Sequence, residues 1–263
     1  MGRLFISVIS HNHDAMIINS NTLAKLAKIS TIILKCNTPA TSRLKDYACK
    51  NGITIIDEDY KIGFGRNNNK TFNYASEKLG LNDDDLFLVL NPDVIIESDT
   101  LKKLISYAQK SNNDIFTLKL FRDKDKKIID SSVKSFPRLL SPLSALVRKN
   151  RSEKYNKKTT KEPIKIDWAA GSFLLFKAKV YKNLEGFDER FFMYFEDVDI
   201  CRRAKKAGYY IIYHPRLEAI HIGAYDNRNI FSKNFYWYFK SYFQYHFPLL
   251  KWFRTTYSSL IKQ

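Results

Sequence analysis

Three carboxylates fall within four positions of the sequence, at Glu196, Asp197 and Asp199. An aromatic run, FFMYF at 191–195, precedes them, and an arginine-containing helical segment that ends at Gly208 follows. Aromatic surroundings desolvate a carboxylate and raise its pKa, neighbouring negative charges act in the same direction, and a helix N-terminus opposes both. Such a carboxylate is a candidate proton acceptor. The alternative interpretation is that these acids only offset the dipole at the start of a helix.

A second candidate is Asn91-Pro92-Asp93, which follows the apolar run LFLVL at 86–90. Asp93 offers oxygen ligands to a hard divalent cation, and Mg²⁺ is usually held by one or two carboxylates together with substrate phosphates. The tripeptide could also be a plain Asn-Pro turn. His221, expected on a loop soon after a strand at 211–213, could complete a metal site, although a lone histidine is more often structural.

The segment KIGFGRNNN at 61–69 contains Gly63 and Gly65, followed by three asparagines. It lacks the third glycine of a dinucleotide-binding fingerprint and is not a P-loop. Its glycines would still allow close approach of the backbone to a ligand, and its amides can bond to sugar or phosphate.

These candidates follow strands of a predicted α/β fold with a mostly parallel sheet. Short apolar runs predict strands, and helical patterns separate them. Strands are expected at 4–10, 31–35, 53–56 and 86–90, with helices at 15–28, 41–51 and from 69 to about 79. Ligands of such sheets gather beyond the carboxyl ends of the strands. Those ends are His11, Cys36-Asn37, 63–69 and 91–93.

The pattern changes from about Ile115, where strands are expected at 116–121, 167–176 and 211–213. The stretch 135–165 between the first two is irregular and very basic: residues 148–161 hold seven Lys or Arg and one acid. It could be a mobile loop over the site or a solvated linker.

The chain of 263 residues carries 44 basic and 27 acidic residues, a formal charge of +17 that suits a polyanionic partner. Nucleic acid, an acidic membrane and a phosphorylated small molecule all fit, but no helix-turn-helix, RNA-binding or zinc signature favours a nucleic-acid-binding module. Three cysteines without metal spacing indicate a reduced, cytosolic compartment. With no secretory signal and no long apolar stretch visible, we expect any membrane association to be peripheral.

Aromatic residues of the tail recur on one helical face, at Phe231, Phe235, Tyr238, Tyr242 and Tyr245. Lysines and arginine lie between further aromatics up to Arg254. This mixture is typical of an interfacial helix on an anionic membrane. The helix could instead pack on the catalytic core, and the two arrangements can coexist on different faces.

Several motifs occur in a consistent order: GFGRNNN, the strand followed by Asn91-Pro92-Asp93, AGSFLLF at 170–176, GFDERFFMYFEDVDICRR at 186–203, and His221. Together they resemble the inverting family 2 glycosyltransferases, which have a GT-A fold. The resemblance covers nearly the full length and is greatest to bacterial rhamnosyltransferases that build O-antigen and related cell-surface polysaccharides.

The resemblance implies roles for particular residues. Asp93 and His221 would bind Mg²⁺ or Mn²⁺ at the sugar-nucleotide diphosphate, and Asp197, next to Glu196, would be the general base. Cys36 stands where an Asp that holds the nucleoside is common. The acceptor would lie near Asp167, Trp168 and Gly171. The nucleotide sugar would be bound by Ser10, His11, Asn37, Gly63, Phe64, Gly65, Asn68, Asn91 and Asp93.

The function implied is transfer of L-rhamnose from dTDP-β-L-rhamnose to a polyprenyl-diphosphate-linked saccharide, at the cytoplasmic face of the inner membrane. UDP-galactofuranose, UDP-glucose or a UDP-N-acetylhexosamine are alternative donors on the same fold. Residues 1–228 would form the GT-A domain, with a nucleotide-binding part to about 114 and an acceptor-binding part beyond it. Residues 229–263 would form a membrane-associating tail. The sequence leaves open whether the protein is a homodimer.

Overall fold

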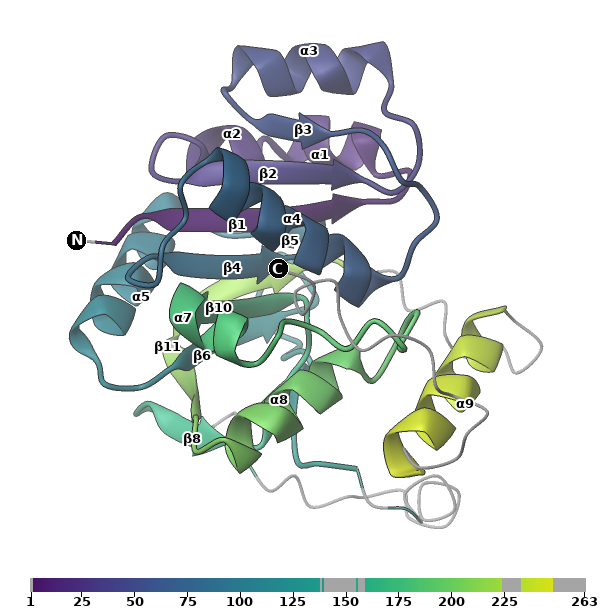
Figure 1. Ribbon diagram of the computed structural model, residues 1–263. Coiled ribbons are helices and arrows are strands. Elements are labelled where there is room, and N and C mark those ends of the chain that lie inside the picture. The colour runs from purple at the N-terminus through teal and green to yellow at the C-terminus, as the bar shows by residue number, and fades with distance from the viewer. Residues whose placement is uncertain (1, 138, 140–154, 156–158, 224–232, 248–263) are drawn as a thin grey trace.

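The computed structural model describes residues 2–137, 139, 155, 159–223 and 233–247. Its centre is a nine-stranded sheet with the order β3-β2-β1-β4-β10-β6-β11-β5, in which β8 pairs with β11 (Figure 1). A separate two-stranded sheet joins β7 to β9. The strands are β1 (Leu4–Ser10), β2 (Thr31–Cys36), β3 (Thr54–Ile56), β4 (Leu86–Leu90), β5 (Val94–Ile95), β6 (Ile115–Phe121), β7 (Val133–Lys134), β8 (Ile164–Ile166), β9 (Trp168–Ala169), β10 (Phe173–Lys177) and β11 (Ile211–His221).

The strands β3, β2, β1 and β4 are all parallel, as the alternation of strands and helices predicts. Beyond β4 the sheet is mixed, because β10 runs antiparallel to both β4 and β6 while β11 is parallel to β6. The predicted α/β fold is therefore confirmed, and the parallel part of the sheet ends at the strand that leads into Asn91-Pro92-Asp93.

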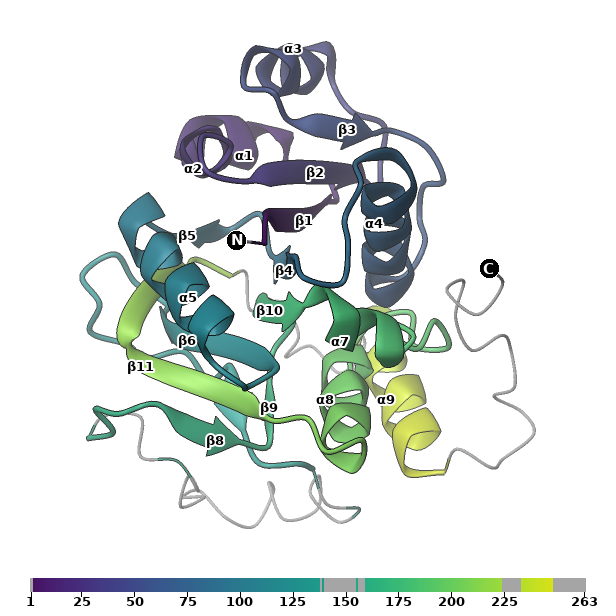
Figure 2. The same ribbon diagram turned by 60° about the vertical axis from the view of Figure 1, so that its left-hand side comes forward.

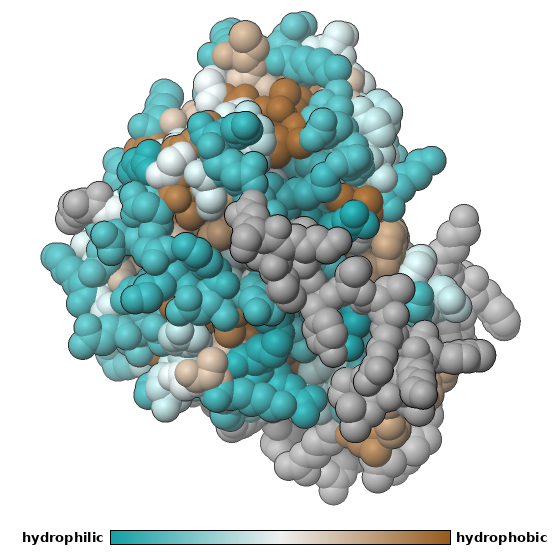
Figure 3. Space-filling view, viewed as in Figure 1, coloured by the Kyte–Doolittle hydropathy of each residue, from teal (hydrophilic) through white to brown (hydrophobic). Residues whose placement is uncertain are grey.

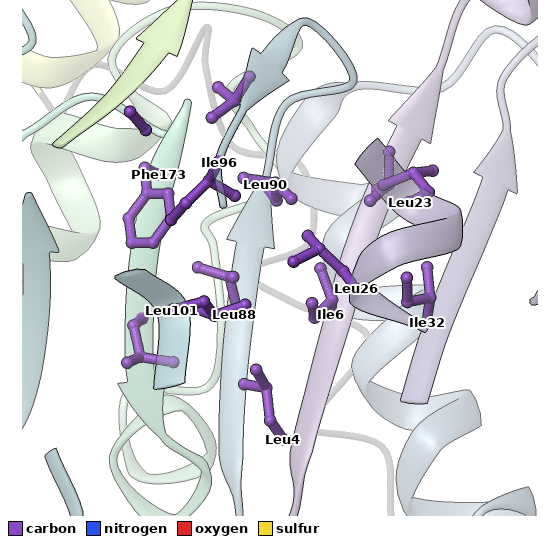
Figure 4. Close-up of a cluster of buried hydrophobic side chains, with 14 of the residues drawn as sticks. Leu4, Ile6, Leu23, Leu26, Ile32, Leu88, Leu90, Ile96, Leu101 and Phe173 are labelled. Atoms are coloured by element: carbon purple, nitrogen blue, oxygen red, sulfur yellow. The ribbon is translucent and has the colours of Figure 1, made fainter. Parts of the chain in front are cut away.

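Helices cover both faces of this sheet (Figure 2). Successive side chains of a strand point to opposite faces: in β1, Leu4, Ile6 and Val8 join the cluster under α1, α2, α3 and α5, whereas Phe5 joins the cluster under α4, α7 and α8. Figure 4 shows part of the first cluster. The helices are α1 (Asp14–Ser20), α2 (Thr22–Leu26), α3 (Ser42–Lys50), α4 (Phe64–Lys78), α5 (Ser98–Lys110), α7 (Ala178–Asn183), α8 (Glu196–Lys206) and α9 (Lys233–His246).

Several element boundaries differ from the sequence prediction. The single strand expected at 167–176 is two strands, β9 and β10, which belong to different sheets and are separated by residues 170–172. The helix expected at 15–28 is divided into α1 and α2, because Asn21 adopts a left-handed conformation with φ 53°. Helix α4 begins at Phe64, so residues 67–69 are helical and not part of a loop. Strand β11 continues past Tyr213, through an irregularity after His214, and ends at His221, which therefore lies on a strand and not on a loop.

The C-terminal helix α9 packs against α8 and the aromatic run before it (Figures 1 and 2). Tyr242 and Tyr245 are buried there with Phe191, Phe195 and Val198. The opposite side of α9 is exposed and aromatic: Tyr236 is 62% exposed and Phe239 53%. The inner face thus packs on the core, one of the two arrangements that the sequence allows.

Much of the surface on the face shown in Figure 3 is hydrophilic, as the large number of lysines and arginines requires. No helix among the residues that the structure describes has both the length and the apolar character needed to span a membrane. Most of the basic stretch at 135–165, together with Phe231 and Arg254 of the tail, lies outside the described residues.

Candidate active site

The turn that carries Asp93 and the start of α8 are connected through two neighbouring residues. The Asn91 amide donates to the Ser172 carbonyl at 3.0 Å, and the amide of Gly171 donates to Asp197 Oδ2 at 3.2 Å. Gly171 and Ser172 immediately precede β10, which begins beside the end of β4. The antiparallel insertion of β10 therefore brings Asp197 to the carboxyl end of the parallel strands.

Both side-chain oxygens of Asp197 accept hydrogen bonds from backbone amides. In addition to the bond from Gly171, its Oδ1 accepts from the Val198 amide at 2.8 Å. Burial raises the pKa of this carboxyl group, while the two N–H donors and the charge of Lys134 lower it, and the net direction is upward. A raised pKa brings a carboxylate closer to the proton affinity that a general base needs near neutral pH.

Glu196 is held differently, although it is the next residue along the chain. Its side chain is buried, and Oε2 has no hydrogen-bond partner among the described residues. Burial, followed by the charge of Asp197, raises its pKa well above the ordinary value. Because only Asp197 has donors on both oxygens, we infer that the pair carries its single negative charge on Asp197 and its proton on Glu196.

The backbone before this pair adopts an uncommon conformation. Tyr194 and Phe195, neither of them glycine, have left-handed φ values of 68° and 70°. Such residues each cost about 1–3 kcal/mol and persist where the surroundings enforce them, often at functional sites. Here the aromatic packing of Phe195 against α9 supplies that enforcement, and the resulting turn directs the chain into α8 at Glu196.

The glycines of the GFG segment allow close packing of α4 on the aromatic run. A Cβ atom at Gly63 would lie 2.7 Å from the Phe192 carbonyl oxygen, and one at Gly65 would lie 2.7 Å from Phe187 Cβ. The Phe64 amide donates to the Phe192 carbonyl at 3.0 Å. The two glycines thus let the backbone of α4 approach the segment that carries Asp197, and not a ligand as the sequence suggested. This contact fixes the position of that segment.

Asp93 and His221 meet because the short strand β5 pairs with the end of β11, with Val94 opposite His221. His221 Nε2 lies 3.5 Å from Asp93 Oδ1, and Nδ1 lies 3.4 Å from Asp130 Oδ2. Burial lowers the pKa of His221, but Asp130 and Asp93 outweigh it and raise the value to about 9. The Oδ1 atom of Asp93 is buried and lacks a well-formed hydrogen bond within the described part of the chain.

Asp93 and His221 form a two-residue donor set of oxygen and nitrogen. No group of three or more His, Cys, Asp or Glu side chains that could hold a metal occurs among the described residues. A buried carboxylate oxygen without a hydrogen bond, 3.5 Å from an imidazole nitrogen, fits a hard cation that replaces the imidazole proton and completes its shell with substrate oxygens.

Asp130 was not identified from the sequence. It lies at the end of a hairpin that follows β6, where its amide donates to the Leu120 carbonyl at 2.8 Å, and its side chain is 6% exposed. The carboxylate also lies 3.6 Å from Arg122 Nε. A carboxylate on the far nitrogen of a histidine fixes the ring's orientation and tautomer. Asp130 therefore directs His221 Nε2 toward Asp93.

The residues predicted to bind the nucleotide at the ends of β1 and β2 have different environments. Ser10 is buried and His11 is exposed. The side chain of Asn37 is bonded within the fold, where its nitrogen donates to the Ile62 carbonyl and its oxygen accepts from the Ile62 amide, both at 3.0 Å. Cys36 is buried, and burial raises the pKa of its thiol to about 12.

Asn68 is also engaged inside the protein. Its amide donates to the Phe64 carbonyl at 3.0 Å, and its oxygen accepts from Ser7 Oγ at 2.7 Å. Asn37 and Asn68 therefore hold the loop and the helix at the end of the sheet together, and each uses its nitrogen and its oxygen in at least one bond within the fold.

The residues predicted near the acceptor lie next to α8. Asp167 forms an ion pair with Lys205 at 3.1 Å. Trp168 Nε1 donates to the Ser135 carbonyl at 2.9 Å, and Lys134 Nζ lies 5.6 Å from the centre of the Trp168 ring. Lys134, a second residue not identified from the sequence, thus contacts the Trp168 ring, and its charge acts on Asp197.

The mixed sheet with helices on both faces is a GT-A-type fold. A family model described as "Glycosyltransferase like family 2" matches residues 40–240. The chain is 36% identical over 246 residues to rhamnosyltransferase WbbL of Escherichia coli K12, with 92% of each chain covered. It is 28% identical over 187 residues to the N-acetylglucosaminyl-diphospho-decaprenol L-rhamnosyltransferase of Mycobacterium tuberculosis, covering 64% of this chain and 58% of that protein.

The solved structure of GalNAc-T7 with UDP, GalNAc and Mn²⁺ superposes with a TM-score of 0.63 at 13% identity. The match covers 93% of this chain and 47% of that one, so the chain spans about half the length of this structural relative, and the likeness concerns the fold alone. The protein belongs to glycosyltransferase family 2, and it is a glycosyltransferase.

Proposed function

We propose that this enzyme transfers L-rhamnose from dTDP-β-L-rhamnose, with inversion, to a polyprenyl-diphosphate-linked saccharide during synthesis of O-antigen or a related cell-surface polysaccharide. The observation that carries the chemistry is the Asp197 carboxyl group, which accepts from two backbone donors and is linked through residues 171 and 172 to the turn of Asp93. The sugar is inferred from the two rhamnosyltransferases to which the chain is similar.

An inverting transfer needs a base on one side of the donor sugar and charge compensation on the other. Asp197 removes the proton from the acceptor hydroxyl, whose oxygen attacks the anomeric carbon as the bond to the diphosphate breaks. Glu196, buried and protonated, keeps a second negative charge away from the base. Asp93 and His221 would hold Mg²⁺ or Mn²⁺, which supplies charge neutralisation to the diphosphate leaving group.

The donor is tested by comparing the thermal shifts produced by dTDP, UDP and GDP. Transfer to a synthetic lipid-linked GlcNAc acceptor is then measured with a panel of nucleotide sugars. Rhamnose transfer from dTDP-rhamnose supports the proposal. A preference for UDP and for UDP-galactofuranose, UDP-glucose or a UDP-N-acetylhexosamine would replace the rhamnosyl assignment and leave the mechanism in place.

Replacing Asp130 by Asn should weaken Mn²⁺ binding by about 10–100-fold, because His221 would lose the partner that directs Nε2. Mn²⁺ titration followed by electron paramagnetic resonance measures this directly and does not depend on turnover. Asp125→Asn is the matched control, since Asp125 lies in the same hairpin with a side chain that is 71% exposed. Equal Mn²⁺ affinity in the wild type and Asp130→Asn would show that Asp130 does not act on the metal site.

We also propose that the enzyme works at the cytoplasmic face of the inner membrane, with the outer face of α9 toward anionic lipid. Exposed aromatics beside Lys240 suit the headgroup region. The double variant Tyr236→Ser/Phe239→Ser should lower sedimentation with anionic vesicles about tenfold or more. Tyr210→Ser, at an exposed tyrosine away from α9, should leave it unchanged. Undiminished sedimentation of the double variant would assign α9 to core packing alone.

A further inference from the structure

A cavity of about 230 Å³ lies between α8, α9 and the segment that follows β7. Its wall combines a cation, polar aromatic groups and apolar side chains. The lining residues are Phe136, Pro137, Leu139, Arg202, Tyr245 and His246. Tyr242, on the adjacent turn of α9, donates a hydrogen bond to the Leu139 carbonyl and holds the segment against the helix.

The polar side of this cavity is positively charged. The Arg202 guanidinium lies 4.9 Å from the centre of the Tyr245 ring and hydrogen-bonds to that side chain, and among the described residues no carboxylate is paired with it. His246 Nε2 is buried without a hydrogen-bond partner among the described residues. A half-buried guanidinium without a counter-charge, next to an unsatisfied imidazole, is stabilised by an anion that bonds to it.

The other side of the cavity is apolar. Phe136, Pro137 and Leu139 offer hydrocarbon surface to whatever lies against Arg202. The volume is below the 300–1,000 Å³ or so that encloses a whole small-molecule ligand, and it suits a phosphoryl group with the first carbons of an attached chain. The exposed aromatic face of α9 belongs to the same helix that lines the cavity and gives such a chain a route to the bilayer.

The cavity adjoins the residues predicted near the acceptor. Lys205 Nζ lies 5.5 Å from the centre of the Phe136 ring, and Phe136 and Trp168 pack on the same aromatic cluster at the base of α9. Lys134 contacts the other aromatic residue of this region, Trp168, and the charge of Lys134 acts on Asp197. A molecule anchored at Arg202 could therefore extend past Trp168 toward the base.

We propose that this cavity binds the prenyl-phosphate end of the lipid-linked acceptor, with Arg202 on the phosphoryl oxygens and with Phe136, Pro137 and Leu139 against the first carbons of the chain. This subsite rests on the proposed function, because a prenyl-diphosphate acceptor is what it would recognise. It would anchor the acceptor at α8 and α9 while the saccharide reaches Asp197.

Binding is tested by calorimetry on the full chain with farnesyl diphosphate, inorganic diphosphate and farnesol, in buffer without divalent cations so that the Asp93–His221 site does not compete. Arg202→Gln should raise the Kd for farnesyl diphosphate about tenfold or more, since a charge-assisted bond is lost. Arg202→Lys, which keeps the charge, should lose less affinity for farnesyl diphosphate than Arg202→Gln does. Lys206→Ala, the loss of one exposed charge on the same helix, should bind as the wild type does. Farnesol and inorganic diphosphate should each bind at least about tenfold more weakly than farnesyl diphosphate.

An unchanged Kd in Arg202→Gln, or farnesol binding as tightly as farnesyl diphosphate, overturns the role of Arg202. If inorganic diphosphate binds as tightly as farnesyl diphosphate, the cavity does not recognise the prenyl chain and is a simple anion site. In transfer assays Arg202→Gln should raise KM for a lipid-linked acceptor and not for a lipid-free GlcNAc glycoside. If the wild type transfers no sugar, the proposed function fails, and the calorimetry still decides whether the cavity binds prenyl phosphate.

Discussion

Replacing Asp197 by Asn should lower kcat by about 10²–10⁴-fold, the range that a general base usually contributes. The amide cannot accept the proton of the acceptor hydroxyl, although it has nearly the same shape and can keep the bond from Gly171. Donor binding should persist, because the metal ligands and the nucleotide-binding loops are unchanged. Steady-state transfer and calorimetry with the donor nucleotide measure the two effects separately.

Two comparisons make this prediction specific to the base. Glu196→Gln should lose far less activity, since Gln imitates the protonated carboxyl group that burial favours at that position. The acid limb of the kcat profile should lie at a higher pH than an ordinary Asp would give, because the pKa of Asp197 is raised and the base must be deprotonated to act. Substantial turnover in Asp197→Asn, with the acid limb retained, would assign the base to another group.

The second large effect is expected for Asp93→Ala, which should lower kcat/KM by about 100-fold or more. Charge neutralisation of a leaving diphosphate by a bound cation amounts to several kcal/mol, and the variant loses the carboxylate that holds the cation. Titration of dTDP-rhamnose with and without Mn²⁺ should show a metal-dependent affinity in the wild type and little dependence in the variant.

Asp99→Ala is the matched control for that experiment, since Asp99 lies on α5 with a side chain that is 85% exposed. Its affinity for dTDP-rhamnose should depend on Mn²⁺ as strongly as that of the wild type does. Donor binding that responds to Mn²⁺ equally in Asp93→Ala would remove Asp93 from the metal site.

Much of the fold could be predicted because its strands are short, apolar and bounded by polar turns. The run LFLVL at 86–90 is buried at every position, and the polar residues after it lie at the carboxyl edge of the sheet, as expected. The contact between Asp93 and His221 depends on β5, which has only two residues, Val94 and Ile95. A pattern of two residues carries no periodicity, so the sequence offered His221 as a possible partner of Asp93 but gave no strand pairing that would bring the two together.

Other parts of the site could not be predicted, because polar residues can serve the interior as well as a ligand. Asn69 illustrates this: its oxygen accepts from Tyr181 and from the Phe187 amide, and its nitrogen donates to the Phe187 carbonyl. Asp130 presents the opposite case. It follows a charged turn that has the composition of a solvated hairpin, yet its side chain is buried against His221.

The position of β10 has a consequence for biosynthesis. Strands β3, β2, β1 and β4 can pair as soon as residue 90 has left the ribosome, but the free edge of β4 is covered only by residues 173–177. Until more than eighty further residues have been added, the nascent chain presents LFLVL as an open hydrophobic edge, which is a template for aggregation. Fragments that end between residues 90 and 172 should therefore be far less soluble than the full chain, even though they contain four complete parallel strands.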